Sequence, residues 1–516
     1  MKRFVAYLAS FVCVVALCLP FSIGSSNNPG NQTNNLTTHW QSQLKLDSTR
    51  EQVSEVHLHV HDDQATSYYE IRYGRLRETI GLDDLNPRGL AFSSLYEDVT
   101  QGAREWAELR KEVLEAEGYT DVKIELITVP KTTLYSLSAS GGISAIDGET
   151  GQTRWQQRVG KVNDPTIGLA ASNTKVVAVR GGQIHCLDAD NGTLIWSRPI
   201  RYAPGGGVAI SDAIPGTGTK KAGESPGFAY VTSVEGRLQI FPLNSRGLPN
   251  VNFSSSGASS DDPEVTANTV SWTTARGFFN VARSSRPELR YRLDTKDEFQ
   301  ASGTSVGPYL IANSITGTVY AVAESKGSLQ WEYRVGERMD RKPIALGQNV
   351  VLLISANNNL LALNVQTGDL VEGWPQRVPG ISEYVGVSEN AVYFMDVANN
   401  LVALDRKTGV TLSRTGLGAN TIAIPNVTTD RLYLVSGSGQ LICLREFNSV
   451  NPFVHGDGSG SKDGSGSKDG SGSKEGSDSK DGSGSKEGSD SKEGSDSKEG
   501  SDAKKVDDDD DPFNNQ

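Results

Sequence analysis

The chain has 516 residues, of which 36% are hydrophobic and 22% charged, and its formal net charge is -12. From Asp457 to the C-terminus there are 17 acidic and 9 basic residues, against 45 and 41 in the rest, so the acidity belongs mostly to a tail. A nearly neutral body excludes the clustered basic surface that nucleic-acid binding requires. Four Cys in this length exclude a small disulfide-built scaffold.

The N-terminus predicts export. Met1-Lys2-Arg3 is followed by a run without charged residues from Phe4 to Ile23, which is the order of a signal peptide cleaved after Gly24. The run is nearly long enough to span a bilayer, so residues 1–24 are either a cleaved signal or a membrane anchor. We therefore expect an exported protein of the periplasm or cell envelope, associated with the membrane if this segment is retained.

Residues 25–120 predict an N-terminal extension that contains one long amphipathic helix. The helix is expected over Arg88–Glu117, because apolar residues recur there at spacings of three and four and Gly118 follows. The predicted apolar stripe consists of Leu95, Val99, Gly102, Trp106, Leu109, Val113 and Ala116. Two interpretations stay open: the stripe packs on the side or end of the following domain, or it docks a partner protein.

A histidine-rich segment precedes this helix. Residues 55–63 read EVHLHVHDD, and strand alternation places His57, His59 and His61 on one face. Three imidazoles on one face are a possible zinc or copper site, with Asp62 or Asp63 as an oxygen ligand. Successive members of such a row lie roughly 7 Å apart, which suits one tetrahedral ion poorly. We predict no metal site here but a polar face that titrates with pH, and keep the metal site as the alternative.

Residues 121–455 repeat with a period close to 41. A seven-residue motif begins at positions 141, 182, 236, 277, 317, 358, 399 and 439, and its first residue is always Gly or Asn. Gly and Asn tolerate the positive φ of a tight turn between two strands. Each copy supplies four strand-like segments and no helical pattern, which predicts an all-β fold, an eight-bladed β-propeller. The one long gap contains a Gly-rich stretch over 204–227, predicted as a loop inserted between blades 2 and 3.

Several repeats carry a large ring eight residues beyond the motif. These rings are Trp155, Trp196, Tyr291, Trp331 and Phe453, with Trp374 two residues late, while Asn250 and Ser413 break the pattern. We interpret the rings as packing between adjacent blades and not as a binding site. Cys186 and Cys443 share the fifth motif position of two blades, so they are predicted to be buried, inert thiols.

The segments GGISAIDGETGQTRW at 141 and GQIHCLDADNGTLIW at 182 resemble the pyrroloquinoline-quinone-type propeller repeat, and the resemblance extends over Lys123–His455. That superfamily includes quinoprotein dehydrogenases and also cofactor-free propellers, such as the lipoprotein of the bacterial outer-membrane β-barrel assembly machinery. In the dehydrogenases the resemblance implies an adjacent Cys-Cys disulfide, calcium ligands from Glu, Asn and Asp, and an Asp base. This sequence contains no Cys-Cys pair and no Cys-x-x-Cys-His haem site.

These features predict a non-catalytic, cofactor-free, exported scaffold that binds an envelope protein or complex. The alternative is a divergent quinone- and calcium-dependent dehydrogenase of alcohols or sugars. Residues 456–516 are rich in Gly, Ser, Lys and Asp and nearly free of apolar residues, which predicts a disordered tail. We interpret the tail, with its acidic end at Asp507–Asp511, as a solubilising spacer, and keep a tether for a partner as the alternative.

Overall fold

The computed structural model describes residues 36–46, 51–74, 76–82, 84, 99–213, 225–244, 250–418, 421–447 and 449. The chain divides into one compact unit, residues 1–460, and a second unit from residue 461 onward. The predicted signal segment, the whole predicted tail and Phe453 lie outside the described residues. All of the described residues belong to the first unit.

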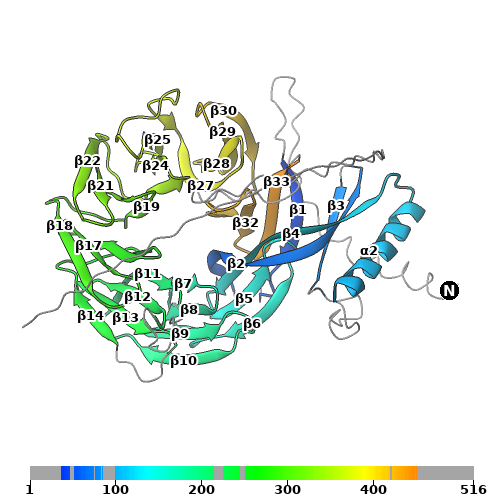
Figure 1. Cartoon of the computed structure of the whole chain (residues 1–516), viewed down its shortest axis with the longest axis horizontal. Coiled ribbons are helices and arrows are strands. Elements are labelled where there is room, and N and C mark those ends of the chain that lie inside the picture. The colour runs from blue at the N-terminus through cyan, green and yellow to red at the C-terminus, as the bar shows by residue number, and fades with distance from the viewer. Residues whose placement is uncertain are drawn as a thin grey trace, which may run out of the picture. The chain divides into compact units, whose positions relative to one another are not determined.

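Eight antiparallel sheets form the first unit, which confirms the predicted eight-bladed propeller (Figure 1). Blade 1 holds β2 (Val53–Tyr73), β4 (Lys123–Ser138), β5 (Gly142–Asp147) and β6 (Thr153–Arg158), with β3 (Leu76–Gly81) as a fifth strand. Blade 2 holds β7 (Thr166–Ala171), β8 (Lys175–Arg180), β9 (Gln183–Asp188) and β10 (Leu194–Pro199). Blade 3 holds β11 (Pro204–Ser211), β12 (Phe228–Ser233), β13 (Arg237–Pro242) and β14 (Val251–Ser254).

The remaining blades follow in chain order. Blade 4 holds β15 (Glu264–Val265), β16 (Thr269–Thr273), β17 (Phe278–Arg283) and β18 (Leu289–Asp294). Blade 5 holds β19 (Thr304–Val306), β20 (Tyr309–Asn313), β21 (Thr318–Ala323) and β22 (Leu329–Arg334), and blade 6 holds β23 (Ile344–Leu346), β24 (Val350–Ile354), β25 (Asn359–Asn364) and β26 (Val378–Pro379). Blade 7 holds β27 (Ile381–Val387), β28 (Ala391–Asp396), β29 (Asn400–Asp405) and β30 (Thr411–Gly416). Blade 8 holds β31 (Thr421–Ile424), β32 (Leu432–Ser436), β33 (Gln440–Glu446) and, from the start of the chain, β1 (Leu36–Gln43).

The burial of each strand follows from its position in the blade. Second strands such as β28 are buried at every residue, because both of their faces pack against neighbouring blades. Outer strands such as β22 alternate between exposed and half-buried residues, because one face meets the next blade and the other meets water. The hydrophobic core therefore consists of layers between consecutive blades and not of one central cluster.

The tight turn that the motif predicted is present in every blade. The first motif residue has a positive φ in all eight repeats, from 60° at Asn358 to 94° at Gly141. Residues other than Gly and Asn adopt this left-handed region only with strain. The alternation of Gly and Asn at this position is therefore explained by backbone geometry.

The propeller begins far upstream of the boundary expected at residue 121. Strand β1 pairs with β33 over Leu36↔Glu446 to Gln43↔Gln440, so the start of the chain closes the last blade. The first half of β2 is the innermost strand of blade 1, paired with β4 over Val53↔Ser138 to Val60↔Thr132. Much of the extension predicted over 25–120 therefore belongs to the propeller itself, because strand pairing across hundreds of residues leaves no local signal in the sequence.

The rest of the extension forms a small module on blade 1. The second half of β2, β3 and the first half of β4 make a three-stranded sheet, and helix α2 (Val99–Ala116) packs on one face of it. The helix ends as predicted: Gly118, with φ 98°, donates to the carbonyl of Glu115, and Tyr119 donates to that of Leu114. The predicted start at Arg88 lies outside the described residues.

The face that the helix turns inward coincides only in part with the predicted stripe, since Val99, Gly102 and Trp106 of the stripe pack on the module core. Its buried residues are Gly102, Ala103, Ala107 and Leu114, while Leu109 and Ala116 of the stripe are exposed. The prediction missed the rest of the buried face because Ala103 and Ala107, which contact the sheet, are small and weigh little in a hydrophobic periodicity. The helix therefore packs on its own module.

The Gly-rich stretch also differs from expectation. Residues 204–211 form β11, the innermost strand of blade 3, and the insertion falls within that blade, between β11 and β12. A side chain on Gly205 would lie 1.9 Å from the carbonyl oxygen of Ser259, and one on Gly207 would lie 2.3 Å from Asp262. The glycines thus permit close packing of blades 3 and 4 instead of forming a loop.

Candidate functional site

The predicted rings lie at the seams between consecutive blades. The indole Nε1 of Trp155 on blade 1 donates to the carbonyl of Ala189 on blade 2, at 2.8 Å. Its ring covers Gly192, where a β-carbon would lie 2.4 Å away and where φ is 70°. The same ring-on-glycine contact joins Tyr291 to Gly327, Trp331 to Gly368 and Trp374 to Gly409, while Trp196 donates to Leu243 of blade 3. The side chains therefore fasten one blade to the next.

A sixth ring comes from a residue that sequence reasoning missed. Trp40 on β1 lies over Gly151 of blade 1, and its Nε1 donates to the carbonyl of Gly148 at 2.8 Å. The repeat spacing had placed Phe453 in this position, and Phe453 lies outside the described residues. The available signal was the strand-like segment LTTHWQSQ upstream of the first repeat, combined with the need of a propeller for a closing strand.

The seam between blades 7 and 8 lacks this arrangement. On blade 5, Trp331, Tyr333 and Val335 face the next blade, whereas blade 7 presents the smaller Ser413 and Thr415 and then Leu417 from the matching positions. The matching glycine is absent as well, because Ser449 occupies its position in the eighth repeat. The seam between blades 7 and 8 therefore lacks both the ring and the glycine that the ring would cover.

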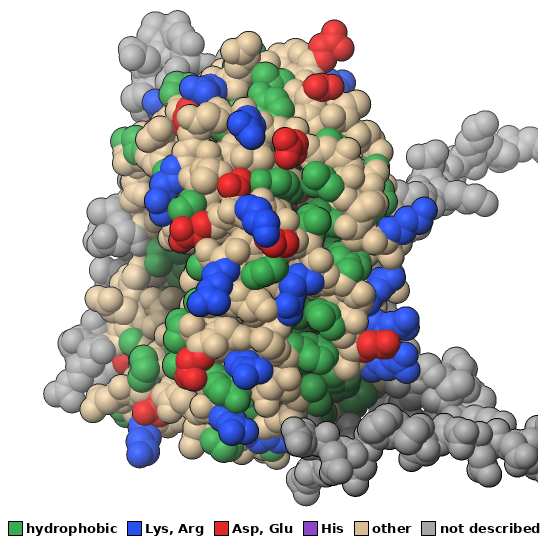
Figure 2. Space-filling view, turned by 90° about the vertical axis from the view of Figure 1, so that its left-hand side faces the viewer, with side chains coloured by type: hydrophobic (Ala, Val, Ile, Leu, Met, Phe, Trp, Pro, Cys, Tyr) green, Lys and Arg blue, Asp and Glu red, His purple; other side chains and the backbone are tan. Residues whose placement is uncertain are grey.

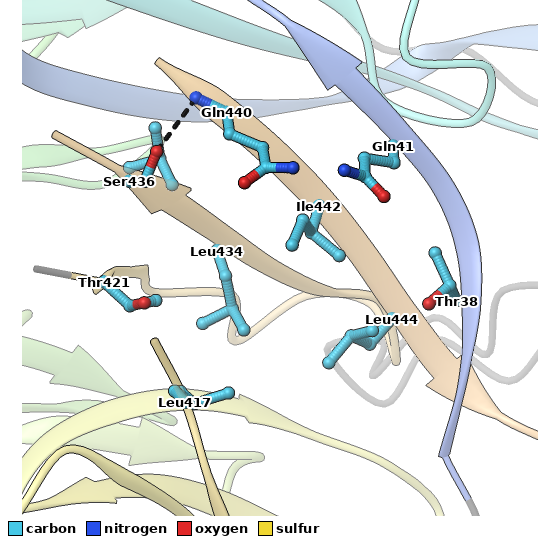
Figure 3. A pocket seen from close by; sticks show the side chains of 10 residues that line it. Thr38, Gln41, Leu417, Thr421, Leu434, Ser436, Gln440, Ile442 and Leu444 are labelled. Atoms are coloured by element: carbon cyan, nitrogen blue, oxygen red, sulfur yellow. Dashed lines mark hydrogen bonds between the residues drawn. The ribbon is translucent and has the colours of Figure 1, made fainter. Parts of the chain in front are cut away.

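A small cavity of about 50 Å³ opens at this seam (Figure 3). Five aliphatic residues line it, and the amide side chains of Gln41 and Gln440 lie at one end. The aliphatic residues are Leu417, Leu434, Val435, Ile442 and Leu444. None of the ten lining residues is titratable, so the cavity provides an apolar shape and no acid–base chemistry.

The histidine strand lies on the inner half of β2. His59 and His61 share a face, with ring centroids 4.6 Å apart and edge to face. His59 Nε2 donates to Asn173 of blade 2 at 2.9 Å, and His61 Nε2 hydrogen bonds with Thr133 at 3.5 Å. Burial, with a smaller contribution from His59, lowers the pKa of His57 to about 4. No three His, Cys, Asp or Glu side chains of the described residues are arranged to hold a metal ion.

Carboxylates of the innermost strands tie neighbouring blades together near the axis. Glu55 accepts a hydrogen bond from the backbone of Leu169 on blade 2, at 3.1 Å. Burial raises its pKa to about 7, and the charge of Asp262 adds to that effect. Glu264 on blade 4 accepts from the backbone of Ser305 on blade 5 and from Lys342, which precedes blade 6, at 2.7 Å. Glu55 and Glu264 therefore connect neighbouring blades.

A buried ion cluster closes the seam between the last and first blades. Glu149 of blade 1, only 1% exposed, lies 3.3 Å from Arg431 of blade 8 and 3.2 Å from His39 of β1. Burial alone would raise the pKa of Glu149, but Arg431 and the hydrogen bond from His39 outweigh it and lower the pKa. Tyr68 of β2 donates to the same carboxylate at 3.4 Å. The cluster joins four segments that lie far apart in the sequence.

A second buried ion pair attaches the module to blade 8. Glu70 of β2 and Arg445 of β33 are both fully buried and lie 3.2 Å apart, and Arg77 of β3 contacts Glu70 at 2.9 Å. Burial of such charges costs free energy unless each finds its partner. The orientation of the module on the propeller is therefore specified by paired charges.

The outer face of blades 4 and 5 carries charges of both signs (Figure 2). Arg283 and Arg286, for example, both pair with Glu288, at 3.3 and 2.7 Å. The basic side chains visible on this face are interspersed with acidic and apolar ones. This mixed surface is typical of a solvated exterior.

The residues present do not fit the quinone and calcium of the alternative interpretation. Cys186 on β9 and Cys443 on β33 are free, buried and on different blades, so they supply no adjacent disulfide. Burial raises the pKa of Cys186 to about 12, which keeps it protonated and unreactive. The described residues also contain no group of three or more His, Cys, Asp and Glu side chains that could hold a metal ion. Among these residues, no helix has the length and apolar character to cross a bilayer.

Similarity to known proteins covers much of the propeller. A family model described as "Outer membrane protein assembly factor BamB" matches residues 98–285 and 269–374, which together exceed half of the chain. A solved structure of BamB from Moraxella catarrhalis is 20% identical and covers 62% of this chain and 93% of its own, with a TM-score of 0.48. The computationally designed Ika8 protein is 14% identical over 60% and 92%, with a TM-score of 0.45. No curated protein matches.

Proposed function

The chain belongs to the family of the outer membrane protein assembly factor BamB, and from this premise we propose that it is a non-catalytic, exported scaffold. In this role the propeller holds another protein or complex of the cell envelope, and assembly of outer-membrane proteins is the process in which it acts. The family match over the propeller is the observation that carries the proposal.

Polar side chains that connect neighbouring blades support the scaffold role. The histidines, the carboxylates near the axis and the buried arginines are engaged in contacts between blades, as at Glu55, His59 and Arg431. A scaffold needs such internal fastening, because it must present a surface of fixed shape to its partner. The module on blade 1 adds exposed apolar side chains, including Leu126 and Leu109, that a partner would cover.

The scaffold is proposed to work without a cofactor. Native mass spectrometry and an absorbance spectrum of the chain, purified from its own compartment, test this point. A mass equal to the bare polypeptide, unchanged after addition of quinone and calcium, is the expected result. A bound quinone mass with a near-ultraviolet chromophore would make the chain a dehydrogenase and overturn the proposal.

The partner is tested by crosslinking in intact cells, followed by purification of the tagged chain from the envelope fraction. We expect one specific envelope protein or complex to be recovered in stoichiometric amount. A matched control is the same chain with Arg431→Leu, which breaks the seam between the first and last blades and should lose the partner. Recovery of no specific partner by the unaltered chain would refute the scaffold function.

A further inference from the structure

The first half of β4 has a free edge. Residues Lys123–Pro130 pair with β2 over Arg72↔Lys123 to Ala65↔Pro130, whereas pairing with β5 begins at Thr133. In the part of the chain that the structure describes, this stretch thus has a strand on one side only. The module sheet is open at β4.

The backbone groups at this edge can be assigned by alternation. The carbonyl of Thr132 points away from β2, because it accepts a hydrogen bond at 2.8 Å from Gly148, which lies on the β5 side. Every second residue before Thr132 has the same orientation, namely Ile124, Leu126, Thr128 and Pro130. Pro130 fits this orientation, since proline has no N–H to give to β2. The N–H and C=O groups of the other three residues therefore face outward and form a template for a further strand.

An apolar and exposed side chain, that of Leu126, lies at this edge. Leu126 is 47% exposed and pairs with Tyr69, so it lies on the face that α2 covers. The same module exposes Leu109 on the helix (38%) and Tyr119 after it (40%). The exposed Leu126 next to open backbone groups favours a strand whose alternate residues are apolar.

The charge of Lys123 at the start of β4 favours one orientation of an incoming strand. The side chain of Lys123 is 69% exposed and its ammonium lies 3.3 Å from the exposed carboxylate of Asp121, whereas the carboxylate of Glu125 is held by Arg72 at 2.6 Å. An incoming strand with an acidic residue opposite Lys123 would complement this end.

We propose that an extended segment of a partner polypeptide adds to β4 as a further strand of the module sheet. Its outward hydrogen bonds go to Ile124, Leu126 and Thr128, its apolar side chains lie beside Leu126, and an acidic residue faces Lys123. The inference rests on the proposed scaffold function and specifies how the partner is held.

The probe is a fluorescent peptide that copies residues 66–73 with Arg72→Glu, because residues 66–73 already pair with β4 at its inner edge, where Arg72 lies opposite Lys123. Fluorescence anisotropy with the full chain measures its affinity. Thr128→Pro removes one outward N–H at a position where proline is tolerated, and we expect about a tenfold loss of affinity. Thr128→Val removes the hydroxyl that bonds with Ser67 but keeps the N–H, and its affinity should stay within about twofold. A peptide that does not bind, or that binds equally to both variants, would overturn the inference.

A second variant, Leu126→Glu, keeps the whole backbone edge and should also weaken the peptide. Hydrogen exchange of the free chain provides a readout independent of any ligand. The amides of Ile124, Leu126 and Thr128 should exchange rapidly and become protected when the peptide binds. Protection in the free monomer would mean that residues 85–98 cover the edge, and protection that grows with protein concentration would mean that a second copy does. Either result refutes the inference.

The crosslinking experiment distinguishes failure of the scaffold function from failure of the proposed docking site at β4. If the chain with Thr128→Pro recovers the same partner as the unaltered chain, the scaffold function stands and the β4 edge is not the docking site. If neither recovers a partner, the scaffold function itself fails.

Discussion

Replacement of Trp40 by alanine tests whether the start of the chain closes the propeller. Trp40 is 6% exposed, lies over Gly151 and donates to the carbonyl of Gly148. A buried indole removes about 200 Å² from water, which at about 25 cal/mol/Å² is worth about 5 kcal/mol as an upper estimate. Measured Trp→Ala losses of about 3–5 kcal/mol agree with this value. We expect Trp40→Ala to lower the free energy of unfolding by about 4 kcal/mol.

Trp40→Phe is the matched control, because it keeps a ring and removes the N–H. The carbonyl of Gly148 retains a donor in this variant, the hydroxyl of Tyr433 at 3.2 Å. The expected loss is therefore small, about 1 kcal/mol.

Urea unfolding followed by circular dichroism measures both variants. With a slope of about 4 kcal/mol per molar, Trp40→Ala should lower the midpoint by about 1 M. Hydrogen exchange should show faster opening of residues 36–46 than of blade 4, because β1 is the strand that loses its anchor. A midpoint within about 0.3 M of the unaltered chain, or equal losses for the alanine and phenylalanine variants, would refute this account of closure.

Three further predictions concern the seams. In thermal melting, Gly368→Ala should lower the free energy of unfolding by about 2 kcal/mol more than Gly182→Ala. Both glycines have φ near 75°, so the backbone strain is the same, but only a β-carbon on Gly368 would meet a ring, that of Trp331 at 2.6 Å. Equal losses would mean that the ring can shift. Burial lowers the folded pKa of His57 to about 4, below its ordinary 6.5, so its contribution to stability is fully present above pH 6.5 and is lost as pH falls toward 4. The loss at pH 5 is roughly 2 kcal/mol, and His57→Gln should remove that part of the pH dependence measured by urea unfolding. Arg431→Leu should cost about 3–5 kcal/mol because it leaves the carboxylate of Glu149 buried and uncompensated, whereas Arg431→Leu combined with Glu149→Leu should recover most of that loss; a double variant as unstable as the single one would show that packing, and not charge, dominates there.

The repeat architecture could be predicted from the sequence because the residues that define each repeat lie close together in the chain. A turn glycine, an alternating strand and a ring recur within some twenty residues of each other, as from Gly141 to Trp155, and each is read without knowledge of the rest of the chain. The number of blades and the turn geometry at Asn358 and Asn399 followed from that pattern. The end of α2 at Gly118 was predictable for the same reason, since a helix C-terminus depends on a few consecutive residues.

The helix face and the Gly-rich strand were less accessible. The face of α2 that packs on the sheet is made partly of alanines, and hydrophobic periodicity weights alanine weakly. The run Gly205–Gly207 has the composition of a loop, yet it is a strand because blade 4 approaches it more closely than any side chain permits.

By itself, then, the sequence determined the eight repeats, their turns and the rings between them, because each repeat encodes its own blade. The tertiary structure alone decided how the circle closes. Leu36 pairs with Glu446, and the buried cluster brings together His39, Glu149 and Arg431, across separations of up to 410 residues. Such contacts join residues hundreds of positions apart in the chain, so no local pattern of residues records them.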